Sequence, residues 1–147
     1  MKLNLNLVVI DSNFILLPFQ FKIDYLNEIR LNLEGQIKFI IFQQIFNELE
    51  AKNRRESKST KFKRLLKFGL IYLEKNKTIY DIEIMDEIKR DFETTDEFLL
   101  RKLTEFKEKH QNVFIATNDS DLRRRSKKLC VSVIFLRQKK YLSIERT

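Results

Sequence analysis

The sequence of 147 residues contains one cysteine, Cys130, and one histidine, His110. A single cysteine cannot form an internal disulfide, and one cysteine with one histidine cannot supply the usual soft ligands of a zinc site. A zinc finger is therefore excluded. His110 lies in the polar stretch FKEKHQN and Cys130 in a strand-like run. We expect a surface imidazole and a small buried hydrophobe there, not a catalytic base and a thiolate nucleophile.

Glycine is almost as scarce, since only Gly35 and Gly69 occur in the chain. Neither a Walker phosphate loop nor a Rossmann phosphate turn can be written without closely spaced glycines. Nucleotide binding through a glycine-rich loop is therefore excluded. Any chemistry would have to come from carboxylates, which bind hard cations such as Mg²⁺ or Mn²⁺.

Long apolar runs are also lacking. The longest, near residues 13–19 and 37–42, are far shorter than the roughly 20 residues that cross a bilayer. No cationic start leads into an apolar run with a small-residue cleavage site. We therefore expect a cytoplasmic protein that does not enter a membrane. The length, the 43% hydrophobic content and the thirteen Phe suit a single domain over residues 1–147.

Positive charge is abundant, with a net charge of +8 and a pI near 9.6. Residues 52–67 contain eight Lys and Arg against a single acid, Glu56, and a second basic cluster spans residues 123–128. Lysine-rich helices are often only solvated faces. Two such clusters on a basic domain favour a polyanionic partner, most simply a nucleic acid backbone. The residues that we expect to contact it are Arg54, Arg55, Lys58, Lys61, Arg64, Arg123, Arg124 and Arg125.

Apolar strand patterns alternate with helical patterns along the chain. Strands are expected at 5–10, 38–42, 78–84, 112–117 and 131–136. Helices are expected at 18–31, after residue 42, within the basic segment 58–73, at 94–109 and at 118–128. This alternation predicts an α/β fold with a parallel sheet covered by helices on both faces.

Two acids follow apolar strands at the same predicted sheet edge. Asp11 comes directly after the strand at 5–10, and Asp119 comes just after the strand at 112–117. Ligands and catalytic groups of such sheets gather at the carboxyl ends of the strands. Two acids there would repel each other unless something positive lay between them.

Two further acids, Glu48 and Asp96, are expected at the same edge. Glu48 follows Ile45 by three residues on a helix, and Asp96 precedes the apolar stripe of the helix at 94–109. Structural roles also suit them. Glu48 could pair with Lys52 at i,i+4, which contributes roughly 0.3 kcal/mol. Asp96 could complement the helix dipole.

The remaining acids of these segments have similar alternatives. Thr94 and Glu97 have the spacing of a capping box. Asn118 or Asp119 could cap the helix that carries the arginines, and Asp121 suits a first-turn dipole role. An acidic pocket within a basic protein nevertheless favours a divalent metal that offsets carboxylate repulsion, with a basic rim that holds phosphates.

The segments VVIDSNFIL, FNELE, TTDEFLL and FIATNDSDLRRR resemble, in order and spacing, the four acidic motifs of the PIN-domain ribonucleases. The resemblance covers essentially the whole chain. It is closest to the archaeal branch related to the eukaryotic pre-ribosomal RNA processing PIN nuclease, through NFILLPFQFKID, TNDSDLRRR and YLSIERT. VapC-type toxins are similar more distantly.

This resemblance implies a three-layer α/β/α sandwich, frequent homodimers, and an endoribonuclease that depends on Mg²⁺ or Mn²⁺. It makes Asp11, Glu48, Asp96 and Asp119 the catalytic, metal-binding acids, with Asp121 and Glu97 as auxiliary acids. Asn13 would support Asp11 by a hydrogen bond, and Thr117 and Asn118 belong to the same supporting group.

Three functions follow from the resemblance. The first is an endoribonuclease in ribosomal RNA maturation, with ribosome assembly factors as partners. The second is a toxin ribonuclease paired with an antitoxin. The third is an RNA-binding assembly factor that does not cleave, although such modules usually have lost acids that this chain retains. A phosphatase or receiver domain fits less well, because the segment Asp11 to Asn13 lacks the second acid of the dehalogenase-type pattern.

Overall fold

The computed structural model describes residues 4–147. Along this range the chain forms β1 (Leu5–Ile10), α1 (Ser12–Ile15), α2 (Leu17–Gln20), α3 (Tyr25–Asn32), β2 (Gln36–Phe42), α4 (Gln43–Arg55), α5 (Thr60–Asn76), β3 (Asp81–Met85), α6 (Thr95–Lys109), β4 (Asn112–Ala116), α7 (Ser120–Lys128), β5 (Ser132–Arg137) and β6 (Tyr141–Glu145). No helix of this part of the chain is long and apolar enough to cross a membrane.

The strands form one sheet in the order β3-β2-β1-β4-β5-β6. All neighbours are parallel except β5 and β6, which pair antiparallel. The central strand β1 is almost wholly buried from residue 6 onward, which explains its continuous apolar run. The predicted parallel α/β sheet is therefore confirmed.

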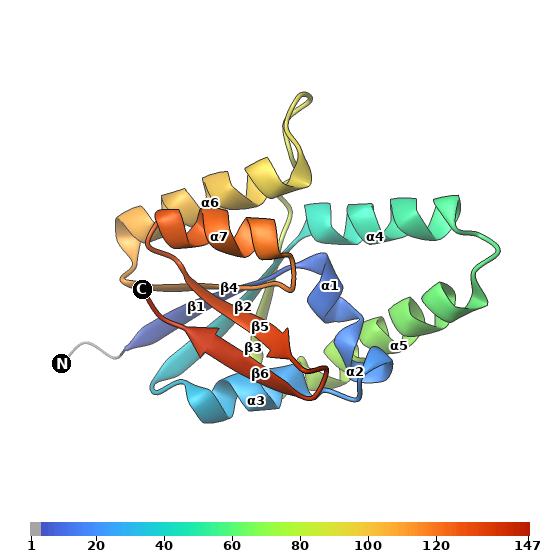
Figure 1. The fold of residues 1–147 in the computed structure, drawn as a ribbon, viewed down its shortest axis with the longest axis horizontal. Helices are drawn as coiled ribbons and strands as arrows, with labels where there is room; N and C mark the ends of the chain where they lie inside the picture. Colours follow the sequence, from blue (N-terminus) through green and yellow to red (C-terminus); the bar gives the residue numbers. More distant parts are fainter. Residues whose placement is uncertain (1–3) are drawn as a thin grey trace.

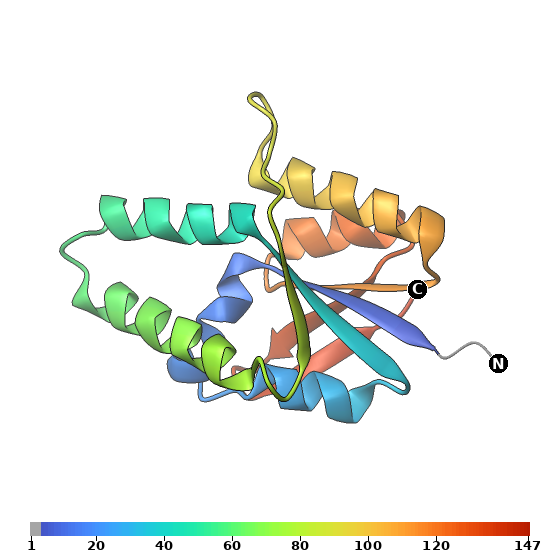
Figure 2. The same ribbon diagram turned by 180° about the vertical axis from the view of Figure 1, so that it is seen from behind.

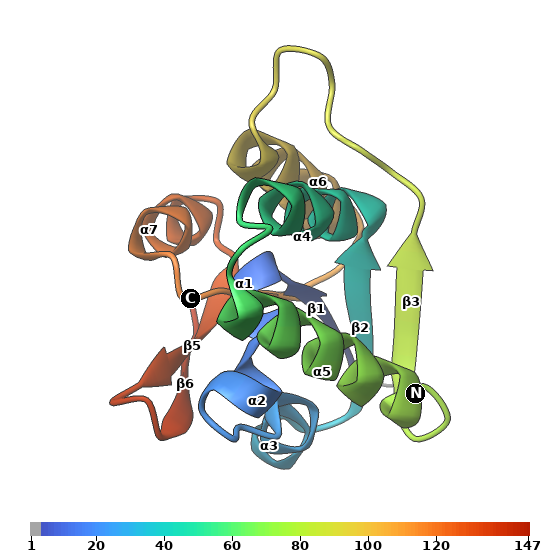
Figure 3. The same cartoon turned by 90° about the vertical axis from the view of Figure 1, so that its right-hand side faces the viewer.

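Helices cover both faces of the sheet, as Figure 3 shows in end view. On one face lie α4, α6 and α7, and on the other lie α2, α3 and α5 (Figure 1). One continuous apolar core runs between the sheet and these helices. The predicted three-layer α/β/α arrangement is confirmed.

The strand β6 was not predicted from the sequence. It follows a tight turn in which the Lys140 N–H donates to the Arg137 carbonyl over 3.0 Å. Gln138 and Lys139 both have positive φ there, at 53° and 56°. Two-residue hairpin turns of this kind usually contain Gly or Asn, and neither occurs here. The usual hairpin signal is thus missing from the sequence.

The helix-rich segment expected at 18–31 is confirmed, and it consists of two helices. α2 ends at Gln20, and α3 begins at Tyr25. Lys22 between them has a φ of 57°, which a right-handed helix does not allow. The strand expected at 78–84 begins only at Asp81, because the preceding residues form a turn after α5.

Cys130 is exposed, so the expectation of a small buried hydrophobe was wrong. It lies in the connection between α7 and β5, where its φ is 62° and its N–H donates to the Lys127 carbonyl over 3.0 Å. His110 caps the end of α6 and is partly exposed. Its position therefore agrees with the expected surface role.

Helices α4 and α5 extend together beyond the sheet, joined by a short turn (Figure 2). Ser59 caps α5, since its side chain accepts from the Phe62 N–H over 3.2 Å. Gly69 lets α5 approach α1 closely, because a Cβ at this position would lie 2.0 Å from the Ile15 carbonyl oxygen. This contact anchors the basic α5 beside the end of β1.

Candidate active site

Asp11 lies where β1 ends, and it is held on both its backbone and its side chain. Its N–H donates to the Ala116 carbonyl over 3.0 Å, so β1 and β4 stay paired to this point. One carboxylate oxygen accepts from the Ser12 N–H (2.8 Å), and the other accepts from the Thr117 hydroxyl (2.6 Å) and the Asn13 amide (3.3 Å). Asp11 therefore caps α1 as well as ending the strand, and Ser12 and Asn13 begin a helix there.

Asn13, Thr117 and Asn118 join the loops at this sheet edge. The Asn13 amide donates to the Thr117 hydroxyl over 3.3 Å, and its oxygen accepts from the Asn118 N–H over 3.0 Å. The Thr117 oxygen also accepts from the Asp119 N–H over 3.1 Å, and the Asn118 side chain accepts from the Leu136 N–H over 2.8 Å. These bonds bring the acids after β1 and β4 together on a common scaffold.

Glu48 and Asp96 face the same edge from two helices. Glu48 lies on α4 and Asp96 in the first turn of α6, and both side chains are partly buried. The alternative pairing of Glu48 with Lys52 does not form an ion pair among residues 4–147. Asp11, Glu48, Asp96 and Asp119 likewise have no ion-pair partner within this range, and we call these four the unpaired acids.

The electrostatics of the unpaired acids show that they interact. Burial raises the pKa of Asp11, and the charges of Asp96 and Asp119 raise it further, against its hydrogen bonds. The pKa of Glu48 is raised by burial and then by Asp11 and Asp96. Burial and Asp119 also raise the pKa of Asp96. Burial and neighbouring carboxylates therefore outweigh the nearby cations, which are Lys52 and Arg55 for Glu48 and Arg125 for Asp96.

Asp119 has the structural role that the sequence left open as well as its place beside the other acids. Its side chain accepts from the Leu122 N–H over 3.0 Å and caps α7. Asp121, one of the two auxiliary acids, instead binds Arg124 and lies 3.7 Å from Arg125. The hydrogen bond from Arg124 lowers the pKa of Asp121.

Glu97, the other auxiliary acid, closes a capping box. It accepts from the Thr94 N–H over 3.0 Å while the Thr94 hydroxyl accepts from the Glu97 N–H over 3.1 Å. These bonds lower the pKa of Glu97, in contrast to that of its neighbour Asp96. The carboxylate of Glu97 is thus used to begin α6.

Gln44 is a buried polar residue that the sequence reasoning missed. It lies one turn before Glu48 on α4, where its amide donates to the Thr95 hydroxyl over 3.3 Å. Its oxygen accepts from the Lys89 N–H over 3.1 Å. Gln44 thus ties the start of α6, and with it Asp96, to α4. A glutamine beside the apolar stripe of α4 was the available signal.

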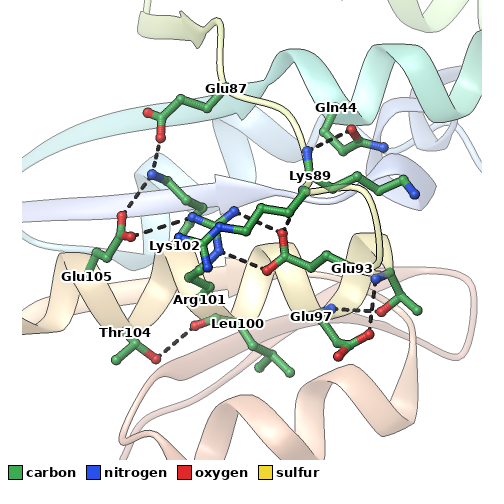
Figure 4. A network of polar contacts seen from close by, with 12 residues as sticks. Gln44, Glu87, Lys89, Glu93, Glu97, Leu100, Arg101, Lys102, Thr104 and Glu105 are labelled. Carbon is green, nitrogen blue, oxygen red and sulfur yellow. Dashed lines mark hydrogen bonds and ion pairs between the residues drawn. The ribbon is translucent and has the colours of Figure 1, made fainter.

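A second group of carboxylates lies along α6 and has cation partners (Figure 4). Glu93 binds Arg101 through two hydrogen bonds of 2.8 and 2.9 Å. Lys102, itself buried, pairs with Glu87 and with Glu105. The bonds from Arg101 lower the pKa of Glu93 to about 2, and the bond from Lys102 lowers that of Glu105. We call Glu87, Glu93 and Glu105 the paired acids.

A cavity of about 190 Å³ opens beside the unpaired acids. It is lined by Ser12, Asn13, Leu16, Glu48, Leu49, Lys52, Arg55 and Phe62. One carboxylate and two cations face the same space. The cavity therefore suits a group that carries negative charge near a bound cation.

The unpaired acids have the chemistry of a hard-cation site. Their ligand atoms are carboxylate oxygens, which Mg²⁺ and Mn²⁺ prefer, and a divalent ion would offset the repulsion between these neighbouring negative charges. Within residues 4–147 no three Asp, Glu, His or Cys side chains are already arranged to hold one ion. The unpaired acids therefore suit Mg²⁺ or Mn²⁺ in the type of their donor atoms and in their charge, but their side chains do not form a complete coordination sphere.

The two basic clusters differ in how their charges are used. Arg54, Arg55, Lys58, Lys61 and Arg64 form the α4–α5 cluster, and none of them makes an ion pair within residues 4–147. In the α7 cluster, Arg124 and Arg125 contact Asp121 and Arg123 lies over the Phe135 ring at 4.0 Å. The α4–α5 cluster is therefore the freer of the two surfaces.

Comparisons with known proteins agree with this fold. The family described as PIN like domain matches residues 8–139. The chain is similar to Ribonuclease VapC4 of Methanocaldococcus jannaschii, with 26% identity over 138 residues that cover 93% of this chain and 95% of that protein. Among solved structures, that of the PIN domain endonuclease Utp24 has a TM-score of 0.67 at 20% identity, covering 96% of this chain and 92% of that one.

Proposed function

This chain belongs to the PIN-like domain family, and we propose that it is an endoribonuclease that hydrolyses phosphodiester bonds with a divalent metal, Mg²⁺ or Mn²⁺. The observation that carries the proposal is the set of unpaired acids at one edge of the sheet, among which Asp11, Glu48 and Asp96 have pKa values raised by burial and by neighbouring carboxylates. Perturbed carboxylates of this kind gather preferentially at functional sites.

Asp11, Glu48, Asp96 and Asp119 would hold the metal. When bound, the ion would generate a hydroxide nucleophile from water and stabilise charge on the phosphate. The protein itself orients the carboxylates. Thr117, Ser12 and Asn13 fix both oxygens of Asp11, and Gln44 fixes the start of α6 that carries Asp96.

RNA is the proposed substrate because free positive charge surrounds the acids. Lys52 and Arg55 line the same cavity as Glu48, and the α4–α5 cluster continues from it. Phosphate contacts of this kind bind a strand without reading its sequence. The cations would hold the backbone while the acids act on one of its phosphodiesters.

We propose ribosomal RNA maturation as the setting, in line with the motifs that resemble the pre-ribosomal RNA processing branch. One observation favours a second candidate, a toxin ribonuclease with an antitoxin partner. It is the 26% identity to Ribonuclease VapC4 over 93% of the chain. Cleavage of purified precursor ribosomal RNA, compared with transfer RNA and messenger RNA, separates the two.

The test of the nuclease is cleavage of a labelled single-stranded RNA with Mn²⁺, Mg²⁺ or EDTA, run beside Asp11→Asn. We expect metal-dependent cutting by the native protein and a loss of at least about 100-fold in the variant, the scale on which single electrostatic groups act in active sites. Circular dichroism checks that the variant folds. If both proteins bind RNA and neither cleaves it, the result would instead favour an RNA-binding assembly factor that does not cleave.

A further inference from the structure

Two phenylalanine rings lie exposed and stacked beside the α4–α5 cluster. Phe19 on α2 and Phe68 on α5 are 42% and 38% exposed, and their ring centroids are 4.6 Å apart at an angle of 23°. Neither belongs to the buried core. Their stacking aligns two aromatic groups at the surface without burying them.

Basic side chains surround this ring pair. The guanidinium of Arg64 lies 5.6 Å from the centre of the Phe19 ring. Phe19, Thr60, Lys61 and Arg64 line a cavity of about 210 Å³. Exposed aromatic rings with Lys and Arg next to them have the chemistry that binds single-stranded nucleic acid, because bases stack on the rings while cations bind phosphates.

The ring pair is close to the unpaired acids along one wall of the molecule. Leu16, which lines the cavity beside Glu48, is three residues before Phe19. α2 packs on α5, and α5 packs on α1 through Gly69. The two cavities therefore both have α5 as a wall. The cavity beside Glu48 is completed by α1 and α4, and the cavity beside Phe19 is completed by α2, whose position beside α1 and α5 can be followed in Figure 1.

We propose that Phe19, supported by Phe68, stacks an unpaired base of an RNA strand while Lys61 and Arg64 bind the adjoining phosphates. The strand passes from this platform along Leu16 to the unpaired acids. The inference rests on the proposed function and makes its substrate single-stranded at this point, because bases in a duplex are already stacked on their neighbours. The basic surface, with Glu56 the single acid of residues 52–67, would attract any polyanion. The exposed, stacked rings argue for RNA over an acidic protein, because the bases of RNA stack on aromatic rings.

The test measures RNA binding in EDTA, so that cleavage plays no part. The chain has no Trp, and Phe19→Trp therefore introduces a single tryptophan at the platform, whose fluorescence can be followed. We expect a short unstructured RNA to quench its fluorescence and to bind with near-native affinity. Phe19→Ala should bind that RNA about 5-fold to 100-fold more weakly, the effect of losing one base stack, and Phe19→Leu should not restore it.

Phe92→Ala is the matched control. This phenylalanine is 99% exposed and lies in the loop between β3 and α6, which projects on the opposite side of the molecule from α2 (Figure 3). Its removal should leave affinity unchanged. Equal losses from Phe92→Ala and Phe19→Ala would overturn the platform, as would full affinity in Phe19→Ala.

Two further outcomes separate this proposal from other readings. A change in sedimentation of Phe19→Ala with unchanged RNA affinity would assign the rings to an interface between copies of the chain, and would overturn the proposal. If RNA binding depends on Phe19 but the protein never cleaves RNA, the platform is supported and the proposed nuclease function is contradicted. If the protein cleaves RNA but its RNA affinity does not depend on Phe19, the nuclease function is supported and the platform is contradicted.

Discussion

Two groups of carboxylates lie beside α6, and members of the two groups have pKa values that shift in opposite directions. Near the start of the helix, burial and neighbouring carboxylates raise the pKa values of Asp11, Glu48 and Asp96. Farther along, Arg101 and Lys102 lower those of Glu93 and Glu105. The paired acids are satisfied by the protein itself and stabilise the link between β3 and α6. The unpaired acids have no ion-pair partner within residues 4–147, and we propose that they bind a cation from outside.

The basic residues divide in the same way. Those of the α7 cluster are occupied by Asp121 and Phe135, whereas the α4–α5 cluster has no ion pairs within residues 4–147. Unpaired charges of both signs therefore meet in the cavity that Glu48 lines together with Lys52 and Arg55. Their coincidence is stronger evidence for a functional site than either group alone.

The largest expected effect compares two neighbours on α6. Asp96→Asn should reduce RNA cleavage by at least about 100-fold, because it removes a carboxylate from the proposed metal site. Glu97→Gln should leave cleavage nearly unchanged, because that side chain closes the capping box with Thr94. Single-turnover cleavage assays compare the two. Similar losses of cleavage in both variants would contradict the distinction between the unpaired acids and the acids with a structural role.

A smaller effect is expected from the hydroxyl that holds Asp11. Thr117→Val keeps the shape of the side chain but removes the 2.6 Å hydrogen bond to the carboxylate. Groups that orient metal ligands typically contribute 10- to 100-fold, and we expect a loss of about that size in activity at low Mn²⁺. Thr104→Val, whose hydroxyl binds only a helix carbonyl, is the control. Rescue of Thr117→Val by excess Mn²⁺ would support an effect on metal binding.

The smallest expected effect is on stability against pH. The pKa values of Asp11, Glu48 and Asp96 are raised on folding, so their contribution to stability is full below the ordinary carboxylate range and is lost as pH rises through the raised values. In EDTA at neutral pH, Asp11→Asn should then unfold at a higher urea concentration than the native protein. We expect its free energy of unfolding to be larger by on the order of 1 kcal/mol, a common size for one substitution. Urea titrations from acid to neutral pH measure the difference. A variant that is less stable at every pH would contradict this sign.

The sequence predicted the layers, the parallel strands and the segments that carry the acids, because buried strands and helix stripes follow from the spacing of apolar residues. It did not locate the features where the backbone adopts positive φ without glycine, namely the break at Lys22 before α3 and the turn at Gln138 and Lys139 before β6. It also missed Gln44, whose role depends on a loop some 45 residues away. The cation partners of Glu87 and Glu93 were likewise beyond sequence patterns, because these acids lie in the loop before α6 and their partners lie on the helix.

The central claim is that the unpaired acids bind a divalent metal and the paired acids do not. The most direct test is a calorimetric titration with Mn²⁺ at neutral pH of the native protein, Asp11→Asn and Glu93→Gln. We expect the native protein and Glu93→Gln to bind Mn²⁺ with the same affinity, and Asp11→Asn to bind it at least about 10-fold more weakly. No binding by the native protein, or equal binding by all three, would contradict it.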